Sequence, residues 1–185
     1  MPSDLLTAPA NDDQPLLALP PPERIQALLF DAARLGRTDI IPALVQAGAN
    51  VTARDPAGYT PLILSCYHGQ EAATALLLEL GAPVDQRDGT RGNTALMGAA
   101  FKGFSAIAER LLAAGAEPDA VNGAGQTALM FAALFSRAII ADRLIACGAD
   151  PHCCDVAGNS AVSVAAAQGK DLLVARLTRR ERVLA

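Results

Sequence analysis

The sequence predicts an all-α solenoid, a stack of helix-turn-helix units joined by finger loops that end in β-turns. Two markers repeat along the chain in phase. A Gly-Ala pair recurs with gaps of 33, 34 and 33 residues, at Gly48-Ala49, Gly81-Ala82, Gly115-Ala116 and Gly148-Ala149. A glycine two residues before Thr or Ser recurs at Gly58, Gly92, Gly125 and Gly158. Because a fixed period in this range is typical of stacked repeats, the chain is expected to fold as one elongated array.

Each internal unit begins with a short helix whose first residues are marked by a capping signal. In the second unit Thr60 is the expected cap, and Pro61 stands at the first helical position, where its missing N–H costs nothing. This helix is expected to stop at Gly69, and a second helix over residues 71–80 carries apolar residues at helical spacing. The loop that follows contains one extra residue within positions 83–91, which predicts one lengthened finger.

This pattern resembles the ankyrin repeat over residues 24 to about 181. Residues 55–62 read Asp-Pro-Ala-Gly-Tyr-Thr-Pro-Leu, close to the family's Asp-x-x-Gly-x-Thr-Pro-Leu, and residues 76–82 match the end of its second helix. The family's His after this motif is replaced by Ile63, Met97, Met130 and Ser163, so we expect an apolar contact there. The Thr-Ala-Leu-Met form at 94–97 and 127–130 is similar to that of small bacterial ankyrin proteins.

We divide the chain into a Pro-rich arm, residues 1–22, and a single ankyrin-repeat domain, residues 23–185. The domain is expected to contain five units, at 24–54, 55–87, 88–121, 122–154 and 155–181. The first unit lacks the Thr-Pro-Leu opening and the last lacks Gly-Ala, so both are expected to cap the stack. Pro42 fits the first turn of a helix if Thr38 or Asp39 caps it.

Composition narrows the possible functions. The net charge of -4 argues against nucleic-acid binding, which normally requires a basic field. The first residues do not form a signal peptide and no apolar run is long enough to cross a membrane, so we expect a cytoplasmic monomer with reduced thiols. The excess of Arg over Lys favours a bacterial source. No cofactor is expected.

The resemblance implies which side chains line a partner-binding groove. In the ankyrin family the groove is formed by the last two residues of each first helix and by fingertip residues. The residues at these positions that we expect to bind are Tyr59, Tyr67, Phe101, Leu134 and Phe135 as apolar anchors, with Arg54, His68, Arg87, Arg91 and Lys102 as polar guides. The chain has two Tyr and five Phe, and four of these seven fall in this set.

Exposed aromatic side chains are frequent anchors of protein interfaces. The alternative is that Phe101 and Phe135 pack on the next repeat and only stabilise the stack. The cations, to which Arg34 is added, favour a partner that presents carboxylates beside an apolar patch; the alternative is a solvated row of charges. We therefore expect a non-catalytic module that binds another protein through its groove and fingertips and regulates or inhibits it.

Two other functions remain open. Cys153 and Cys154 follow His152, but neither a C-x-x-C nor an H-x-x-x-H spacing occurs, so we predict no metal site. A fingertip thiol is nevertheless accessible to oxidants, which makes an oxidative-stress sensor the first alternative. The second is a self-assembly module whose groove is filled by the arm or by another copy. Cys66 stands where later units have Ala, so we predict that it is buried. The sequence contains no recognisable catalytic motif, so we do not expect an enzyme.

Overall fold

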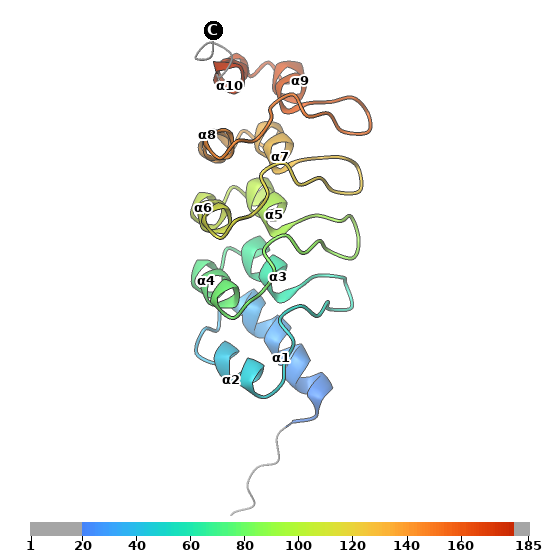
Figure 1. Ribbon diagram of the computed structural model, residues 1–185, viewed down its shortest axis with the longest axis vertical. Helices are drawn as coiled ribbons and strands as arrows, with labels where there is room; N and C mark the ends of the chain where they lie inside the picture. The colour runs from blue at the N-terminus through green and yellow to red at the C-terminus, as the bar shows by residue number, and fades with distance from the viewer. Residues whose placement is uncertain (1–19, 180–185) are drawn as a thin grey trace, which may run out of the picture.

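The computed structural model describes residues 20–179, and within them it has ten α-helices and no β-strand, which confirms the predicted all-α solenoid (Figure 1). Residues 1–19, most of the expected arm, and residues 180–185 lie outside the described residues. The helices form five consecutive pairs: α1 (Pro22–Leu35) and α2 (Ile41–Gln46), α3 (Pro61–Tyr67) and α4 (Glu71–Glu79), α5 (Ala95–Lys102) and α6 (Ser105–Ala113), α7 (Ala128–Leu134) and α8 (Ala138–Ala146), α9 (Ala161–Ala167) and α10 (Asp171–Leu177).

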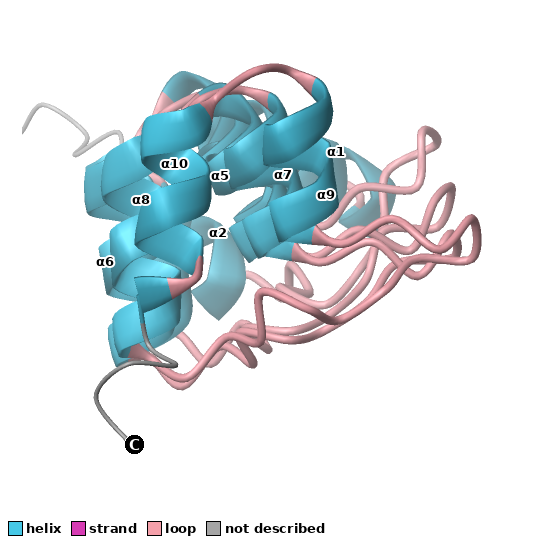
Figure 2. Ribbon diagram, turned by 90° about the horizontal axis from the view of Figure 1, so that it is seen from above, coloured by secondary structure: helices cyan, strands magenta, loops and turns pink. Residues whose placement is uncertain are grey.

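The first helix of each pair belongs to an inner column and the second to an outer column. In Figure 1 the inner helices α1, α3, α5, α7 and α9 lie between the outer helices and the finger loops, and Figure 2 shows that the fingers all project to the same side. Small residues let neighbouring inner helices approach closely, and Cys66 is buried as predicted at the position held elsewhere by Ala33, Ala100 and Ala133. Large apolar side chains fill the space between the columns: Leu62, Leu96, Leu129, Leu77, Leu111 and Leu144.

Most inner helices begin at the caps that the sequence predicts. A side-chain oxygen accepts a hydrogen bond from the backbone N–H three residues on, at 3.2–3.4 Å, in Thr60, Thr94, Thr127 and Ser160. Each bond satisfies a donor that the helix itself leaves free. The cap expected for α2 is wrong, since Ile40 precedes that helix without a side-chain bond and the carboxylate of Asp39 accepts from Arg37 instead. Pro42 does lie in the first turn of α2.

Side chains from the following unit cover the ends of three inner helices. The last carbonyl groups of a helix lack an internal donor and carry a partial negative charge, so amide and cationic donors stabilise them. The bonds run from Gln70 to the carbonyl of Arg34 at 3.0 Å, from Arg137 to that of Phe101 at 3.4 Å, and from Lys170 to those of Ala133 and Leu134 at 2.8 and 2.9 Å. These bonds tie the second unit to the first, the fourth to the third and the fifth to the fourth.

The fingers are ordered by an acidic or amide side chain at the start of each turn. In the second unit Oδ1 of Asp55 accepts from the backbone N–H groups of Ala57 and Tyr59. Asn122 and Asp155 make the equivalent pairs of bonds in later units. Adjacent fingers are also joined through their backbones, by N–H to carbonyl bonds from Gly89 to Gly58, from Gly123 to Arg91 and from Val156 to Ala124, at 2.8–3.0 Å.

The third finger is longer than the others, at the place where the sequence predicts an inserted residue. Its closing backbone bond runs from the N–H of Asp88 to the carbonyl of Asn93, one residue further than the bond from Asp55 to Tyr59. The carboxylate of Asp88 is buried and accepts from the N–H groups of three successive residues, Thr90 to Gly92, at 2.7–2.9 Å. The extra residue is therefore held in a defined turn.

Gly58→Ala and Gly158→Ala form a matched pair that tests the contact between fingers. Both glycines have positive φ, 87° and 80°, so alanine at either position costs about 1–2 kcal/mol of backbone strain. A Cβ atom at Gly58 would also lie 3.1 Å from the Cα atom of Gly89, whereas at Gly158 nothing lies within 4 Å. We expect Gly58→Ala to lower the free energy of urea unfolding more than Gly158→Ala does. Equal losses would contradict a tight contact between the second and third fingers.

Candidate protein-interaction site

Three aromatic rings form a continuous row across the ends of α3, α5 and α7. Tyr67 and Phe101 are stacked with their centroids 6.1 Å apart and their planes at 8°. Phe101 meets Phe135 edge to face, with centroids 4.7 Å apart and planes at 78°. Tyr67 nevertheless remains 42% exposed and Phe135 37% exposed. The rings therefore stabilise the stack across three repeats and still present apolar surface to solvent.

Polar groups flank this aromatic row. Nζ of Lys102 lies 4.1 Å from the centroid of the Tyr67 ring and 5.8 Å from that of Phe101, within the range of a cation–π interaction. The exposed His68 meets the edge of the Tyr67 ring at a centroid distance of 5.9 Å. Leu134, the remaining predicted residue on a helix end, is also exposed. The structure thus gathers the predicted helix-end residues on one face.

A hollow of about 340 Å³ lies between the aromatic row and the fingers. Tyr67, Phe101, Phe131 and Met97 supply its apolar lining, and Gly98 lines it without a side chain. From the fingers, the hollow is lined by Tyr59, Asp88, Thr90, Arg91, Asn93, Asn122 and Gln126. The predicted residues Tyr59 and Arg91 therefore border the same space as Tyr67 and Phe101. Gly98 is a site residue that we did not anticipate from the sequence.

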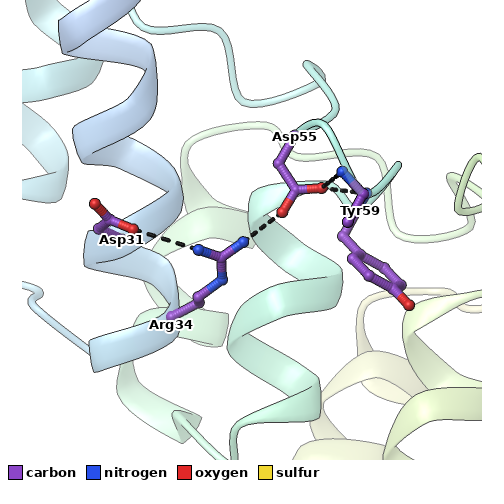
Figure 3. Close-up of polar contacts among 5 residues, drawn as sticks. Asp31, Arg34, Asp55 and Tyr59 are labelled. Atoms are coloured by element: carbon purple, nitrogen blue, oxygen red, sulfur yellow. Dashed lines mark hydrogen bonds and ion pairs between the residues drawn. The ribbon is translucent and has the colours of Figure 1, made fainter.

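Arg34 is held by carboxylates of the chain itself. Figure 3 shows its guanidinium between Asp31 and Asp55, with which it forms ion pairs. The carboxylate of Asp55 is buried and also accepts from the backbone of Tyr59. Removal of Arg34 would leave this buried charge without its cation, at a high cost. Arg34, expected among the cations of the groove, therefore stabilises the second finger through this ion pair.

The three predicted fingertip cations differ in their surroundings. Nε and Nη2 of Arg54 donate to the backbone carbonyl of Arg87 at 3.3 and 2.9 Å, so Arg54 bridges the second and third fingers. The side chains of Arg87 and Arg91 are exposed and make no hydrogen bond or ion pair within residues 20–179. These two cations remain available to carboxylates of a partner, while Arg54 has a structural role that register alone did not reveal.

The cysteines of the fifth finger lie in different environments. Within the described part of the chain, no three His, Cys, Asp or Glu side chains gather in a way that could hold a metal ion. Burial, followed by the negative charges of Asp119 and Asp150, raises the pKa of the Cys153 thiol. Because the thiolate is the reactive form, this shift slows attack on oxidants. Cys154 is exposed, and its Sγ donates to the carbonyl of His152 at 3.3 Å.

Comparison with known proteins identifies the family. A model of three consecutive ankyrin repeats matches the chain over residues 29–122 and again over 96–181. The chain therefore belongs to the ankyrin-repeat family, whose members are generally non-catalytic modules that bind other proteins. None of the helices in residues 20–179 has the length and hydropathy that a bilayer span requires.

The chain is similar to parts of several proteins that contain ankyrin repeats or have regulatory names. It is 39% identical over 84 residues to an ankyrin repeat-containing protein of Treponema pallidum, covering 45% of this chain and 28% of that protein. It is 36% identical over 100 residues to NF-kappa-B inhibitor alpha of Mus musculus, covering 51% and 32%. It is 37% identical over 59 residues to protein phosphatase 1 regulatory subunit 27 of Homo sapiens, covering 32% and 38%. The chain thus spans about a third of the length of these curated relatives.

Asp88, which lines the hollow, is expected to make stability depend on pH. Burial opposes ionisation of Asp88, but the hydrogen bonds from the backbone of the turn outweigh it and lower the pKa of the carboxyl. A carboxyl whose pKa is lower in the folded state contributes stability above its unfolded pKa, near about 4. This stability is lost as pH falls through the folded value.

Asp88→Asn keeps an acceptor oxygen at this position but removes the charge. We expect the variant to be less stable than the wild type at neutral pH, and the difference to shrink as pH falls below about 4, because the wild-type carboxyl takes up a proton first in the unfolded and then in the folded protein. Urea unfolding of both proteins at neutral and at acidic pH measures the difference. A difference that stays the same at both pH values would show that Asp88 acts through shape rather than charge.

The thiols should react in the order of their exposure and acidity. Burial raises the pKa of Cys66 to about 12, and Cys147 and Cys154 are exposed. With N-ethylmaleimide at neutral pH, we expect modification of Cys147 and Cys154 first, slower modification of Cys153, and modification of Cys66 only in urea. Mass spectrometry of the digested protein identifies the modified residues. Rapid modification of Cys153 would instead support the oxidant-sensor alternative.

Proposed function

We propose that this chain binds another protein through the aromatic row, the adjacent hollow and the fingertip cations. The observation that carries the proposal is the aromatic row itself, because Tyr67, Phe101 and Phe135 hold one another in place while Tyr67 and Phe135 remain exposed and Phe101 partly exposed. Exposed aromatic residues are the usual energetic anchors of interfaces. A surface that is already ordered loses little conformational entropy when a partner binds.

The charge around the row favours a partner that presents carboxylates beside an apolar patch. Lys102 and His68 flank the rings, and Arg87 and Arg91 stand on the third finger, although the whole chain carries a net charge of -4. A cationic region on an acidic chain steers an acidic partner toward one face and raises the rate of association.

We further propose that binding regulates the partner by covering part of its surface. The names of two similar proteins describe an inhibitor and a regulatory subunit, which supports a role of this kind here. In this proposal residues 23–185 act as one binding domain of five units, in the cytoplasm and as a monomer. The binding surface spans the three internal units, so it needs no second copy.

A double substitution, Tyr67→Ala with Phe101→Ala, tests the role of the aromatic row. Truncation of one interface anchor costs about 2 kcal/mol or more, so the affinity for the partner should fall at least about 30-fold. The matched control is Ile139→Ala with Leu172→Ala, which removes exposed apolar side chains from the outer helices α8 and α10. Affinity purification with tagged wild-type protein identifies the partner, and titration calorimetry measures each affinity.

Because the rings also stabilise the stack, the Tyr67/Phe101 variant should unfold at a lower temperature than the control, so binding is measured at a temperature at which circular dichroism shows both variants to be fully folded. Loss of the partner from the Tyr67/Phe101 variant alone supports the proposal. Equal binding by both variants, or loss from the outer-helix variant alone, would place the interface elsewhere on the solenoid.

A further inference from the structure

Gly98 occupies a helix position that carries an apolar side chain in other units of the stack. The repeat register aligns it with Leu64 on α3, Phe131 on α7 and Val164 on α9, so the other internal and C-terminal units place an apolar side chain at this position. Glycine inside a helix destabilises it relative to alanine, because it adds flexibility to the unfolded chain. Gly98 lies in the middle of α5, so helix stability does not explain why glycine is present there.

The backbone conformation at this position does not require glycine. Gly98 is absent from the glycines of positive φ, so any L residue fits its conformation. A Cβ atom built on it would find only Cδ2 of Tyr67, at 4.0 Å, which is an ordinary contact distance. The missing side chain instead leaves the hollow of about 340 Å³ open between Tyr67, Phe101 and Phe131.

A second irregularity borders the same hollow. The lengthened finger of unit three contributes Asp88, Thr90 and Arg91 to its lining. The carboxylate of Asp88 is occupied by the backbone of its own turn, whereas the guanidinium of Arg91 is exposed and forms no ion pair in the described chain. The hollow therefore combines aromatic walls with an available cation at one side.

Amide groups complete the polar side. Nδ2 of Asn122 donates to Oδ1 of Asn93 at 2.9 Å and to Oε1 of Gln126 at 3.1 Å. Both of these acceptor oxygens are thus used, and the NH₂ groups of Asn93 and Gln126 remain as donors at the wall of the hollow. The finger side of the hollow offers donors and a positive charge, which match carbonyl and carboxylate oxygens.

We propose that the hollow at Gly98 is a subsite for one aromatic or large aliphatic side chain of an acidic segment of the partner. The side chain packs against Tyr67, Phe101 and Phe131, and a carboxylate one or two residues away pairs with Arg91 or Lys102. This inference rests on the proposed function and adds to it the kind of segment that is bound. The fit of the apolar side chain in the hollow anchors the segment, and the pairing of its carboxylate with a cation determines which segments bind.

Gly98→Leu fills the subsite without harming the fold. Leucine is the residue that unit two has at this position, and it is a better helix former than glycine, so the melting temperature should not fall. Gly98→Ala adds only a Cβ atom and leaves most of the hollow open. Ala106→Leu is the matched control, because it adds the same bulk at an exposed position on the outer helix α6.

The probe is a phage-displayed library of random dodecapeptides, selected on the immobilised wild-type chain of residues 1–185. The expected consensus is one Phe, Tyr, Trp or Leu with Asp or Glu within two residues. A synthetic peptide of the consensus is then titrated against each variant by fluorescence anisotropy. We expect Gly98→Leu to weaken it at least tenfold, Gly98→Ala to weaken it less, and Ala106→Leu to leave it unchanged. Replacing the peptide's acidic residue by Lys should weaken binding to the wild type.

Three outcomes would overturn the subsite. These are a failure to enrich any such consensus, a consensus without an apolar anchor, and unchanged binding to Gly98→Leu. None of them decides the proposed function, because loss of the cellular partner from the Tyr67/Phe101 variant still supports binding through the aromatic row. If that variant keeps the partner while Gly98→Leu loses the peptide, the hollow accepts the peptide, but both the wider interface and the assignment of the subsite to the cellular partner are wrong.

Discussion

The structure depends on the close contact between successive inner helices. Each of these helices presents small residues to its neighbour, and Ala33, Cys66, Ala100 and Ala133 are all fully buried there. Ala166 has the same position in the last unit but is exposed, since no further repeat covers it among the described residues. A larger side chain at any of the buried positions would push two units apart, and the interior of a protein tolerates such overpacking poorly.

Because the inner helices are uniformly spaced, the side chains and finger loops that project from them are aligned from one repeat to the next. It brings Tyr67 over Phe101, and it brings the backbone of one finger within hydrogen-bonding distance of the next. It also places Gln70 and Lys170 where they reach the open carbonyl groups of the preceding helix. The binding surface is therefore a consequence of the stacking contact, and its rigidity comes from contacts between repeats rather than within one repeat.

The periodicity was sufficient to predict the fold, the burial of Cys66 and the alignment of the helix-end aromatics. It was insufficient to predict the contacts of the charged residues. The repeat register fixes the position of the backbone, but it does not determine which group a long side chain reaches. Arg34 was expected among the groove cations and Arg54 among the guides, yet Arg34 is paired with Asp55 and Arg54 donates to a backbone carbonyl. Gly98 differs, since comparison with the aligned positions of the other units would have revealed the missing side chain.

In a repeat protein, the positions that depart from the repeat pattern indicate the functional site better than the positions that follow it. A position that serves only the stack is expected to keep side chains of similar size and polarity in the internal units, because each internal unit meets similar neighbours. Unit three has gained a residue in its finger and lost a side chain at Gly98, and both changes border one hollow. Departures from local rules without a structural gain tend to mark functional sites. The added residue changes which groups of the finger reach the hollow, and the absent side chain gives a partner space to enter it, so the two changes favour one site of recognition.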